Sequence, residues 1–288
     1  MQSTFEAQAL SERLALDETG IWRAPHSAPV SFPVDDYAAC FRVEDGSFWF
    51  GHRNRCITEA VRQWQPPGFI LDVGGGNGYV AGGLIEAGHE TVLLEPGAEG
   101  ARNARAFRLI PHVICATFDG AGLKPASVPA VGLFDVLEHI EDDERFIEKL
   151  KRVLRPGGLV YLTVPAHQWL WSITDVDAGH FRRYSTRQLT SRFTAAGFDV
   201  LYATYFFETL VLPFYLLRTL PFQLGFRERR EVSRYEAEHA AGGKLPSRAL
   251  QRLFERELRT IAAHRTLPTG TSCLLVARKP AGATAGVT

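Results

Sequence analysis

Residues 70–83 read ILDVGGGNGYVAGG: an apolar run containing one acid, a cluster of glycines, and a second apolar run. The first run predicts a buried strand and the second predicts a helix. Glycines between a strand and a helix let the backbone adopt left-handed conformations, and they let amides at the helix N-terminus approach a ligand closely. This stretch therefore predicts a ligand-binding loop at the carboxyl end of a strand.

Strands and helices alternate on the carboxyl side of this stretch. Seven apolar segments predict strands, at residues 69–74, 90–97, 112–120, 130–139, 159–166, 199–207 and 271–280. Segments with helical spacing lie between them, at residues 77–88, 100–109, 142–158 and 186–198. Such alternation predicts a Rossmann-like α/β fold, a mostly parallel sheet with helices on both faces.

Further regions surround the alternating part. Residues 1–66 predict an N-terminal helical lid, with one helix over 47–64, before a main domain over 67–280. Residues 208–268 predict a helical insertion before the last strand, and 281–288 predict a flexible tail.

The apolar stretch 200–222 is interrupted by charged residues and prolines. This pattern favours a strand that passes into an amphipathic helix over a membrane span. Apolar residues within 205–225 suit a peripheral membrane contact or a homodimer face.

Composition and charge are those of a globular chain. The 288 residues include 32 Lys and Arg against 32 Asp and Glu, so no net positive charge favours nucleic acid as a partner. Residues 227–239 carry dense charges of both signs and predict an exposed helix. Four scattered cysteines without metal-ligand spacing, and an N-terminus without a signal-peptide core, predict a cytoplasmic protein with reduced thiols and no metal site.

Two ligand-binding patterns fit the glycine loop. A dinucleotide fingerprint, G-x-G-x-x-A, is matched by Gly76, Gly78 and Ala81. A second pattern, D-x-G-x-G-x-G, also accounts for the acid and the first glycine; it is matched by Asp72, Gly74, Gly76 and Gly78. Glu95, at the end of the next strand, suits the ribose hydroxyls of either ligand and does not discriminate between them.

Five motifs in order resemble those of the class I S-adenosylmethionine-dependent methyltransferases. LDVGGGNG (71–78) is similar to their first motif, VLLEPG (92–97) to the second and TFDGAGL (117–123) to the third. LFDVLEHIED (133–142) and VLRPGGLVYLTVP (153–165) are similar to the later motifs. The resemblance covers about residues 68–166. It implies a seven-stranded sheet with an antiparallel last strand, S-adenosylmethionine as cofactor and S-adenosylhomocysteine as product.

The same resemblance implies which residues bind the cofactor. Glu95 would hold the ribose, and Asp119 would contact the adenine amino group. The other implied cofactor-binding residues are Asp72, Gly74, Gly76, Gly78, Phe118, Phe134 and Asp135. Arg53 is placed to meet the cofactor carboxylate. Many relatives open the fourth strand with a Phe-Asp pair where this chain has Val128 and Pro129, but the strand tip still suits cofactor binding.

Residues 165–189, after the fifth predicted strand, are rich in groups for acceptor chemistry. They leave the carboxyl end of a strand, so we expect them to lie over the methyl group. His180, and after it His167, are the predicted general bases for an oxygen acceptor. The predicted acceptor contacts are Trp49, Trp169, Trp171, Arg182, Arg183 and Tyr184. The two arginines suit an anionic acceptor, whereas His139 in LEHI is interpreted as a structural turn residue.

Together these inferences predict an S-adenosylmethionine-dependent methyltransferase that acts on a small-molecule, lipid or glycan-type acceptor. O-methylation is the favoured reaction. Two alternatives stay open at this point. One is an NAD-dependent oxidoreductase that uses the same loop, and the other is a non-catalytic methyltransferase-like binding protein.

Overall fold

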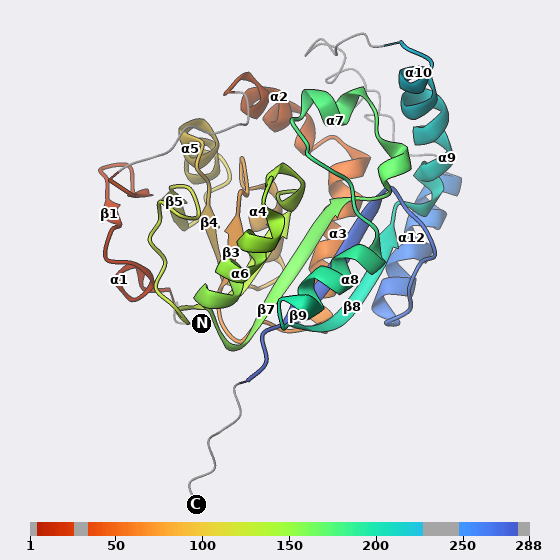
Figure 1. Cartoon of the computed structure of the whole chain (residues 1–288). Helices are drawn as coiled ribbons and strands as arrows, with labels where there is room; N and C mark the ends of the chain where they lie inside the picture. Colours follow the sequence, from red (N-terminus) through yellow and green to blue (C-terminus); the bar gives the residue numbers. More distant parts are fainter. Residues whose placement is uncertain (1–4, 26–33, 227–247, 282–288) are drawn as a thin grey trace, which may run out of the picture.

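The computed structural model describes residues 5–25, 34–226 and 248–281. Its centre is a nine-stranded sheet in the order β1-β2-β5-β4-β3-β6-β7-β9-β8 (Figure 1). The strands are β1 (Ala15–Leu16), β2 (Trp22–Arg23), β3 (Ile70–Val73), β4 (Thr91–Leu94), β5 (His112–Cys115), β6 (Val128–Phe134), β7 (Leu154–Pro165), β8 (Asp199–Phe206) and β9 (Ser272–Arg278).

The strand directions confirm the predicted α/β class. Neighbouring strands from β2 to β7 pair in parallel, and β9 runs antiparallel to both β7 and β8. All seven predicted strands are present, and the last one is antiparallel as the resemblance implied. The short strands β1 and β2 extend one edge of the sheet, where the sequence predicted only helix and loop. Two-residue strands leave no periodicity in a sequence, so the prediction missed them.

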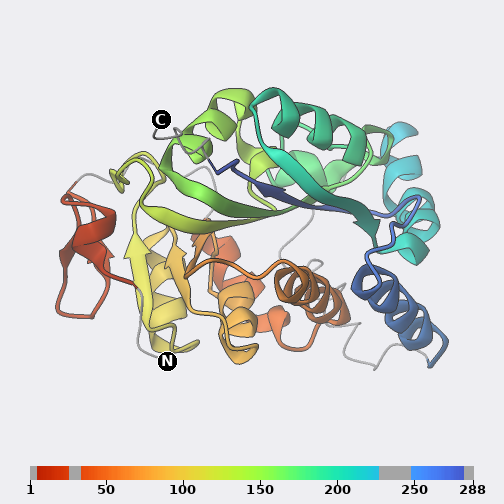
Figure 2. The same ribbon diagram turned by 90° about the horizontal axis from the view of Figure 1, so that it is seen from below.

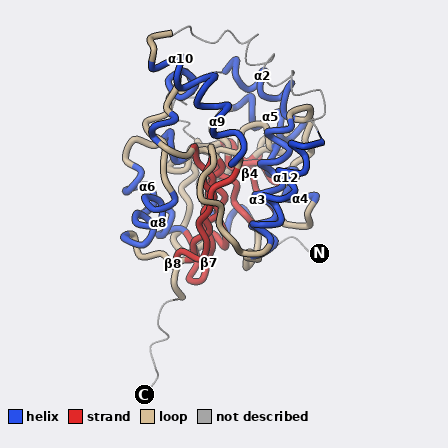
Figure 3. The backbone as a smooth tube through the Cα atoms, turned by 90° about the vertical axis from the view of Figure 1, so that its right-hand side faces the viewer, coloured by secondary structure: helices blue, strands red, loops and turns tan. Residues whose placement is uncertain are grey.

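Helices cover both faces of the sheet (Figures 2 and 3). They are α1 (Ala7–Leu10), α2 (Val34–Glu44), α3 (Phe48–Gln63), α4 (Tyr79–Glu86), α5 (Ala98–Ala106), α6 (Asp143–Val153), α7 (Ile173–Asp177), α8 (Thr186–Ala195), α9 (Val211–Phe214), α10 (Leu220–Gln223) and α12 (Arg248–Ala262). Helices α6 and α8 pack on one face, and α3, α4 and α12 pack on the other. Every residue of β3, β4 and β6 is buried, because helices exclude water from both faces of these strands.

The described part of the insertion, 208–226 and 248–268, consists of several short helical segments and the longer helix α12, joined by turns. The 3₁₀-helix η3 (Glu208–Leu210), α9, the π-helix η4 (Tyr215–Thr219) and α10 follow β8 directly. No helix within the described residues is long and apolar enough to span a membrane. The exposed helix predicted over 227–239 and the tail over 282–288 lie outside the described residues.

A buried carboxylate joins α3, α12 and the end of β8. Glu257 on α12 accepts hydrogen bonds from the amides of Phe207 and Glu208 at 3.0 and 2.6 Å. Its carboxylate also lies 2.8 Å from Nε2 of His52 on α3. Phe207 has a left-handed backbone, with φ of 60°. Glu257 therefore satisfies the two amides that this turn would otherwise bury without partners.

We predict that Glu257→Ala lowers the free energy of unfolding by about 3 kcal/mol, because it leaves two buried amides and one imidazole without an acceptor. Urea denaturation measures the change. Glu255→Ala on the same helix is the matched control. Glu255 pairs only at the surface with Arg55, and we expect its loss to change stability by less than about 1 kcal/mol. Equal effects of the two substitutions would contradict this role of Glu257.

Candidate active site

The glycine loop turns the chain sharply from β3 into α4. Gly74, Gly76 and Gly78 all have positive φ, at 69°, 56° and 81°. A Cβ added at Gly76 would meet no atom within 4 Å, so the loop is open on that side. A Cβ at Gly75 would instead lie 2.6 Å from Oδ2 of Asp72, and no side chain fits there. The loop thus exposes backbone on one side and closes over Asp72 on the other.

Glu95 follows β4 and lies directly against this loop. Its carboxylate accepts hydrogen bonds from the Gly76 amide at 2.8 Å, from the Gly97 amide at 2.6 Å and from the Tyr37 hydroxyl at 2.7 Å. Burial raises the pKa of Glu95, although these hydrogen bonds act to lower it. Burial likewise raises the pKa of Tyr37, so this hydroxyl is a donor to the carboxylate at neutral pH. Helix α2 of the N-terminal region therefore reaches the site through Tyr37.

Asp72 is fully buried at the end of β3. Neither carboxylate oxygen has a hydrogen-bond partner among the described residues. Burial raises the pKa of Asp72 to about 7; nearby Arg53 acts to lower the pKa, and Glu95 acts to raise it further. An unpartnered buried carboxylate is unfavourable, so its presence points to a ligand that supplies a donor or a positive charge.

The end of β6 carries two more acids. Asp135 has φ of 60° and accepts a hydrogen bond from the Thr163 hydroxyl at 3.0 Å. Its other oxygen lies 2.8 Å from the guanidinium of Arg53, which projects from α3. Glu138, in the 3₁₀-helix η1 (Leu137–His139), is fully buried, and its carboxylate has no hydrogen-bond partner among the described residues.

Four carboxyl groups thus gather with one guanidinium at the carboxyl edge of the sheet. They come from Asp72, Glu95, Asp135 and Glu138, and the cation is Arg53. This composition suits a ligand that brings hydroxyl donors and a positive charge. It disfavours a pyrophosphate, whose negative charges would face buried carboxylates without compensation. The charges therefore weigh against the dinucleotide alternative.

The segment after β7 leaves the strand at Ala166 and returns beside it at Tyr184. Ala166 and Tyr184 form a parallel bridge, and the His167 amide donates to the Tyr184 carbonyl at 2.7 Å. Arg183 donates to both oxygens of Asp175 at 2.7 and 2.9 Å and to the Ala166 carbonyl at 3.2 Å. The buried Asp175–Arg183 pair therefore holds α7 over the end of the strand.

Three histidines lie near this segment, in different settings. His180 is hydrogen bonded through Nδ1 to Asp175 at 2.9 Å, and its ring centroid lies 4.7 Å from that of His139. Burial and His180 lower the pKa of His139 to about 4. His167 stacks on Tyr205 and lies 3.1 Å from the Thr269 hydroxyl; burial lowers its pKa, and Arg183 adds to this. Only His180 among the three is oriented by a carboxylate.

Several residues predicted to contact the acceptor have partners in the interior of the protein. Arg183 is committed to Asp175, and the Tyr184 hydroxyl donates to Asp143 at 2.7 Å. Arg182 also pairs with Asp143, at 2.9 Å. These contacts arise from tertiary packing, so the sequence could not distinguish them from substrate contacts.

The predicted aromatic contacts divide between the interior and the surface. Trp49 stacks on Phe207 and lies 5.5 Å from the Arg53 guanidinium, on the inner side of α3. Trp169 is 50% exposed, and Trp171 is half-buried. An open hollow of about 400 Å³ is lined by Trp169, Val211, Leu212, Tyr215 and Gln223.

The two residues predicted for the adenine side have partners of their own. Phe118 packs against Phe146 on α6. Asp119 lies 2.7 Å from Lys149, with 70% of its side chain exposed. Both follow β5, and two strands, β4 and β3, lie between β5 and the strand β6 that precedes Asp135.

The sequence analysis did not identify Tyr37, Thr163 or Glu138 as site residues. Tyr37 lies in a segment without any motif, so no sequence signal pointed to it. Glu138 could have been noticed, because the pair Glu138–His139 follows the end of a strand closely, as functional side chains of parallel sheets do.

Comparison with known proteins identifies the family of the chain. A family model described as a methyltransferase domain matches residues 51–203. The chain is 24% identical over 178 residues to a probable S-adenosylmethionine-dependent methyltransferase of Mycolicibacterium smegmatis, covering 61% of this chain and 68% of that protein. It is 28% identical over 109 residues to a ubiquinone biosynthesis O-methyltransferase of Xanthomonas campestris, covering 36% and 46% respectively. The chain thus spans about half to two thirds of the length of these curated relatives.

The fold is also similar to that of a SAM-dependent methyltransferase of Thermotoga maritima. The TM-score is 0.52 at 16% identity, and the match covers 85% of this chain and 96% of that one. The family model extends over more than half of the chain and includes the glycine loop, Glu95 and Asp135. The chain therefore belongs to the class I S-adenosylmethionine-dependent methyltransferases.

Proposed function

We propose that the protein transfers a methyl group from S-adenosylmethionine to a hydroxyl group of a small-molecule acceptor of lipid or glycan type. The observation that carries the choice of a hydroxyl is the Asp175–His180 hydrogen bond of 2.9 Å, at the carboxyl edge of the sheet. A carboxylate that orients an imidazole is the usual arrangement for removing a proton from a hydroxyl group.

The residues at this edge fit the cofactor of the family. When bound, S-adenosylmethionine supplies a methyl group on a positively charged sulfur. Glu95 would hold the ribose hydroxyls, since the Gly76 amide donates to its carboxylate and fixes it beside the glycine loop. The unpartnered carboxylate of Asp72 would face the positive charge of the ligand.

We propose a different role for Arg53 from contact with the cofactor carboxylate. Its guanidinium is bound to Asp135 at 2.8 Å, so we propose that it positions this acid rather than the cofactor carboxylate. Phe134 and Asp135 would then border the cofactor at the end of β6. Phe118 and Asp119 remain proposals for the adenine side.

The partners of Arg182 and Arg183 bear on the kind of acceptor. Arg182 and Arg183 both pair with buried acids, and this supports an acceptor that does not depend on them for an anionic group. The hollow beside the exposed Trp169 favours an acceptor with an apolar part. One relative is named as a ubiquinone biosynthesis O-methyltransferase, and this name supports the choice of a hydroxyl acceptor.

Exposed apolar side chains continue from this hollow along α9, η4 and α10. Leu212, Leu217 and Leu224 are 64%, 76% and 68% exposed. Such a surface suits delivery of an apolar acceptor from a membrane, and it is also where a homodimer would form. Flotation with liposomes and sizing with and without detergent separate these two uses.

The first prediction concerns the cofactor. Calorimetric titration should show binding of S-adenosylmethionine and S-adenosylhomocysteine and no binding of NAD. Glu95→Ala should weaken both adenosyl ligands by about ten- to a hundredfold, because charge-assisted hydrogen bonds to the ribose contribute about 1.5–3 kcal/mol. Binding of NAD alone would overturn the proposal in favour of the oxidoreductase alternative.

A second prediction uses the raised pKa of Asp72, at about 7 in the free protein. A positively charged ligand favours the ionised carboxylate, so binding lowers this pKa. Affinity for S-adenosylmethionine should then be full above pH 7 and fall about tenfold from pH 8 to pH 6, as the carboxyl is protonated. Titrations across this range in Asp72→Asn should lack this dependence. If Asp72→Asn shows the same pH dependence of affinity as the wild type, the dependence comes from the ligand and not from Asp72.

A third prediction concerns the base. With hydroxyl acceptors such as phenols and polyols, His180→Ala should lower kcat by about a hundredfold or more, as loss of a general base does. His167→Ala should have a smaller effect, because His167 is held by Tyr205 and Thr269. Release of S-adenosylhomocysteine measures turnover. Full turnover in both variants would contradict the base assignment, and binding without turnover on any acceptor would favour the non-catalytic alternative.

A further inference from the structure

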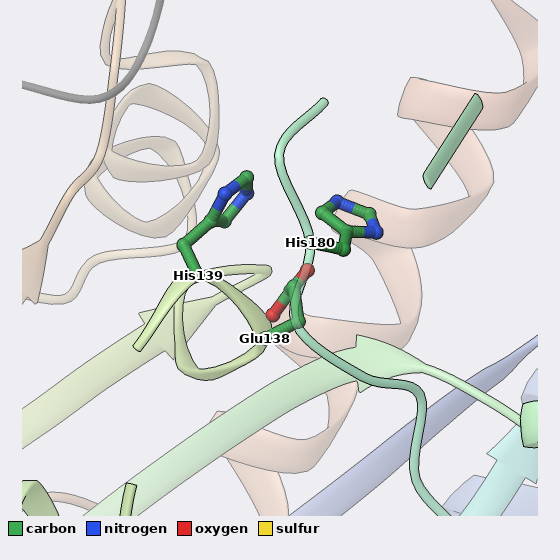
Figure 4. A group of neighbouring side chains, drawn as sticks. All are labelled: Glu138, His139 and His180. Atoms are coloured by element: carbon green, nitrogen blue, oxygen red, sulfur yellow. The ribbon is translucent and has the colours of Figure 1, made fainter. Parts of the chain in front are cut away.

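Two adjacent residues after β6 meet a third from the segment after α7. Glu138 and His139 belong to η1, and His180 follows α7 (Figure 4). One ligand atom from each lies within 4.8 Å of the other two. The Phe181 amide donates to the Glu138 carbonyl at 2.8 Å, so a backbone hydrogen bond fixes the two segments together. The cluster is therefore built into the fold.

The Glu138 carboxylate has a feature that the proposed methyl transfer does not explain. It is fully buried, and neither oxygen accepts a hydrogen bond from another described residue. The nearby cation Arg53 is bound to Asp135 instead. Burying an ionised carboxylate without a partner is strongly unfavourable unless it takes up a proton or a cation compensates its charge. The carboxylate and the two imidazoles share one small space, which is where that cation would lie.

The histidines are prepared for such a cation. Asp175 occupies Nδ1 of His180 at 2.9 Å, which leaves Nε2 as the ligand atom. Asp175 is itself held by both ends of the Arg183 guanidinium. Metal-binding histidines are commonly oriented by a carboxylate on the other ring nitrogen in this way. His139 places its ring 4.7 Å from that of His180, centroid to centroid.

We propose that Glu138, His139 and His180 bind a divalent transition-metal ion, with zinc as the best fit. Two imidazole nitrogens and one carboxylate form a three-residue set typical of catalytic zinc, which leaves a fourth position open. Magnesium prefers oxygen ligands and would bind more weakly. Zinc–ligand distances of about 2.0–2.2 Å require the three atoms to approach to about 3.3 Å, which small side-chain rotations accomplish.

The metal's role rests on the proposed methyl transfer to a hydroxyl. The acceptor oxygen would fill the open position, and the metal would lower the pKa of its hydroxyl, as it does for bound water. With the metal bound, His180 Nε2 is a ligand and no longer the general base, so the metal replaces it in that role and the hydroxyl proton would pass to solvent. The acceptor oxygen would form the O–CH₃ bond with its lone pair, while the methyl–sulfur bond breaks and its electrons stay on sulfur. The products are the methyl ether and neutral S-adenosylhomocysteine.

Metal binding can be measured without turnover. Metal-free protein, prepared with a chelator, would be titrated with Zn²⁺ by calorimetry and with Co²⁺ by its visible d–d absorption. We expect one ion per chain and the strong absorption of four-coordinate cobalt. His180→Ala and Glu138→Gln should each weaken binding by at least about a hundredfold, more than the loss of an outer-shell partner does. Glu138→Gln removes the buried charge with little change in shape, so it should fold even if His180→Ala does not.

His89→Asn is the control, because His89 lies between α4 and β4, at the opposite edge of the sheet. It should bind Zn²⁺ like the wild type. Equal affinity of wild type and Glu138→Gln, or sub-stoichiometric binding lost equally in all variants, would overturn the site. A parallel titration with S-adenosylhomocysteine separates the two proposals. Cofactor binding without zinc binding rejects the metal site alone, whereas zinc binding without cofactor binding rejects the proposed function and leaves the metal site standing.

Discussion

Parallel strands that end at one edge bring the side chains after them into a shared, poorly hydrated space. Here that space holds carboxyl groups from β3, β4 and β6, and Arg53 is the cation bound among them. Buried acids need donors, cations or protons. Glu95 obtains donors from the glycine loop and from Tyr37, and Asp135 obtains them from Arg53 and Thr163. Asp72 and Glu138 accept no hydrogen bond from another described residue, and burial raises the pKa of both.

This difference divides the edge into two functional halves. The half around Asp72 and Glu95 belongs to the glycine loop, where a ligand with hydroxyl groups and a positive charge complements the acids. The half around Glu138 adjoins the segment after β7, where two imidazoles lie close to the carboxylate. Arg53 pairs with Asp135 and is close enough to both halves to lower the pKa of Asp72 and of Glu138 against the effect of burial.

The segment after β7 is held in place by contacts within itself and with the strand that it leaves. Arg183 ties Asp175 to the start of the segment, and the Ala166–Tyr184 bridge closes its base. The same arginine lies 4.8 Å from the ring of Phe214, so the insertion packs on this segment as well. Arg183, which the sequence suggested as a substrate contact, thus holds the carboxylate that orients His180. A site held this way places its reactive groups accurately without waiting for the substrate.

The sequence by itself determined the fold class, the seven main strands and the family, because these depend on local periodicity and on motifs within short stretches. It also located the glycine loop, Glu95 and Asp135, since strand ends and glycine clusters can be read residue by residue. Only the tertiary structure decided which polar residues have partners. Arg183 and Tyr184 donate hydrogen bonds to buried acids, whereas the carboxylate of Glu138 accepts no hydrogen bond from another described residue. Partners of this kind lie tens of residues apart in the chain, and their pairing follows from packing, which no local pattern encodes.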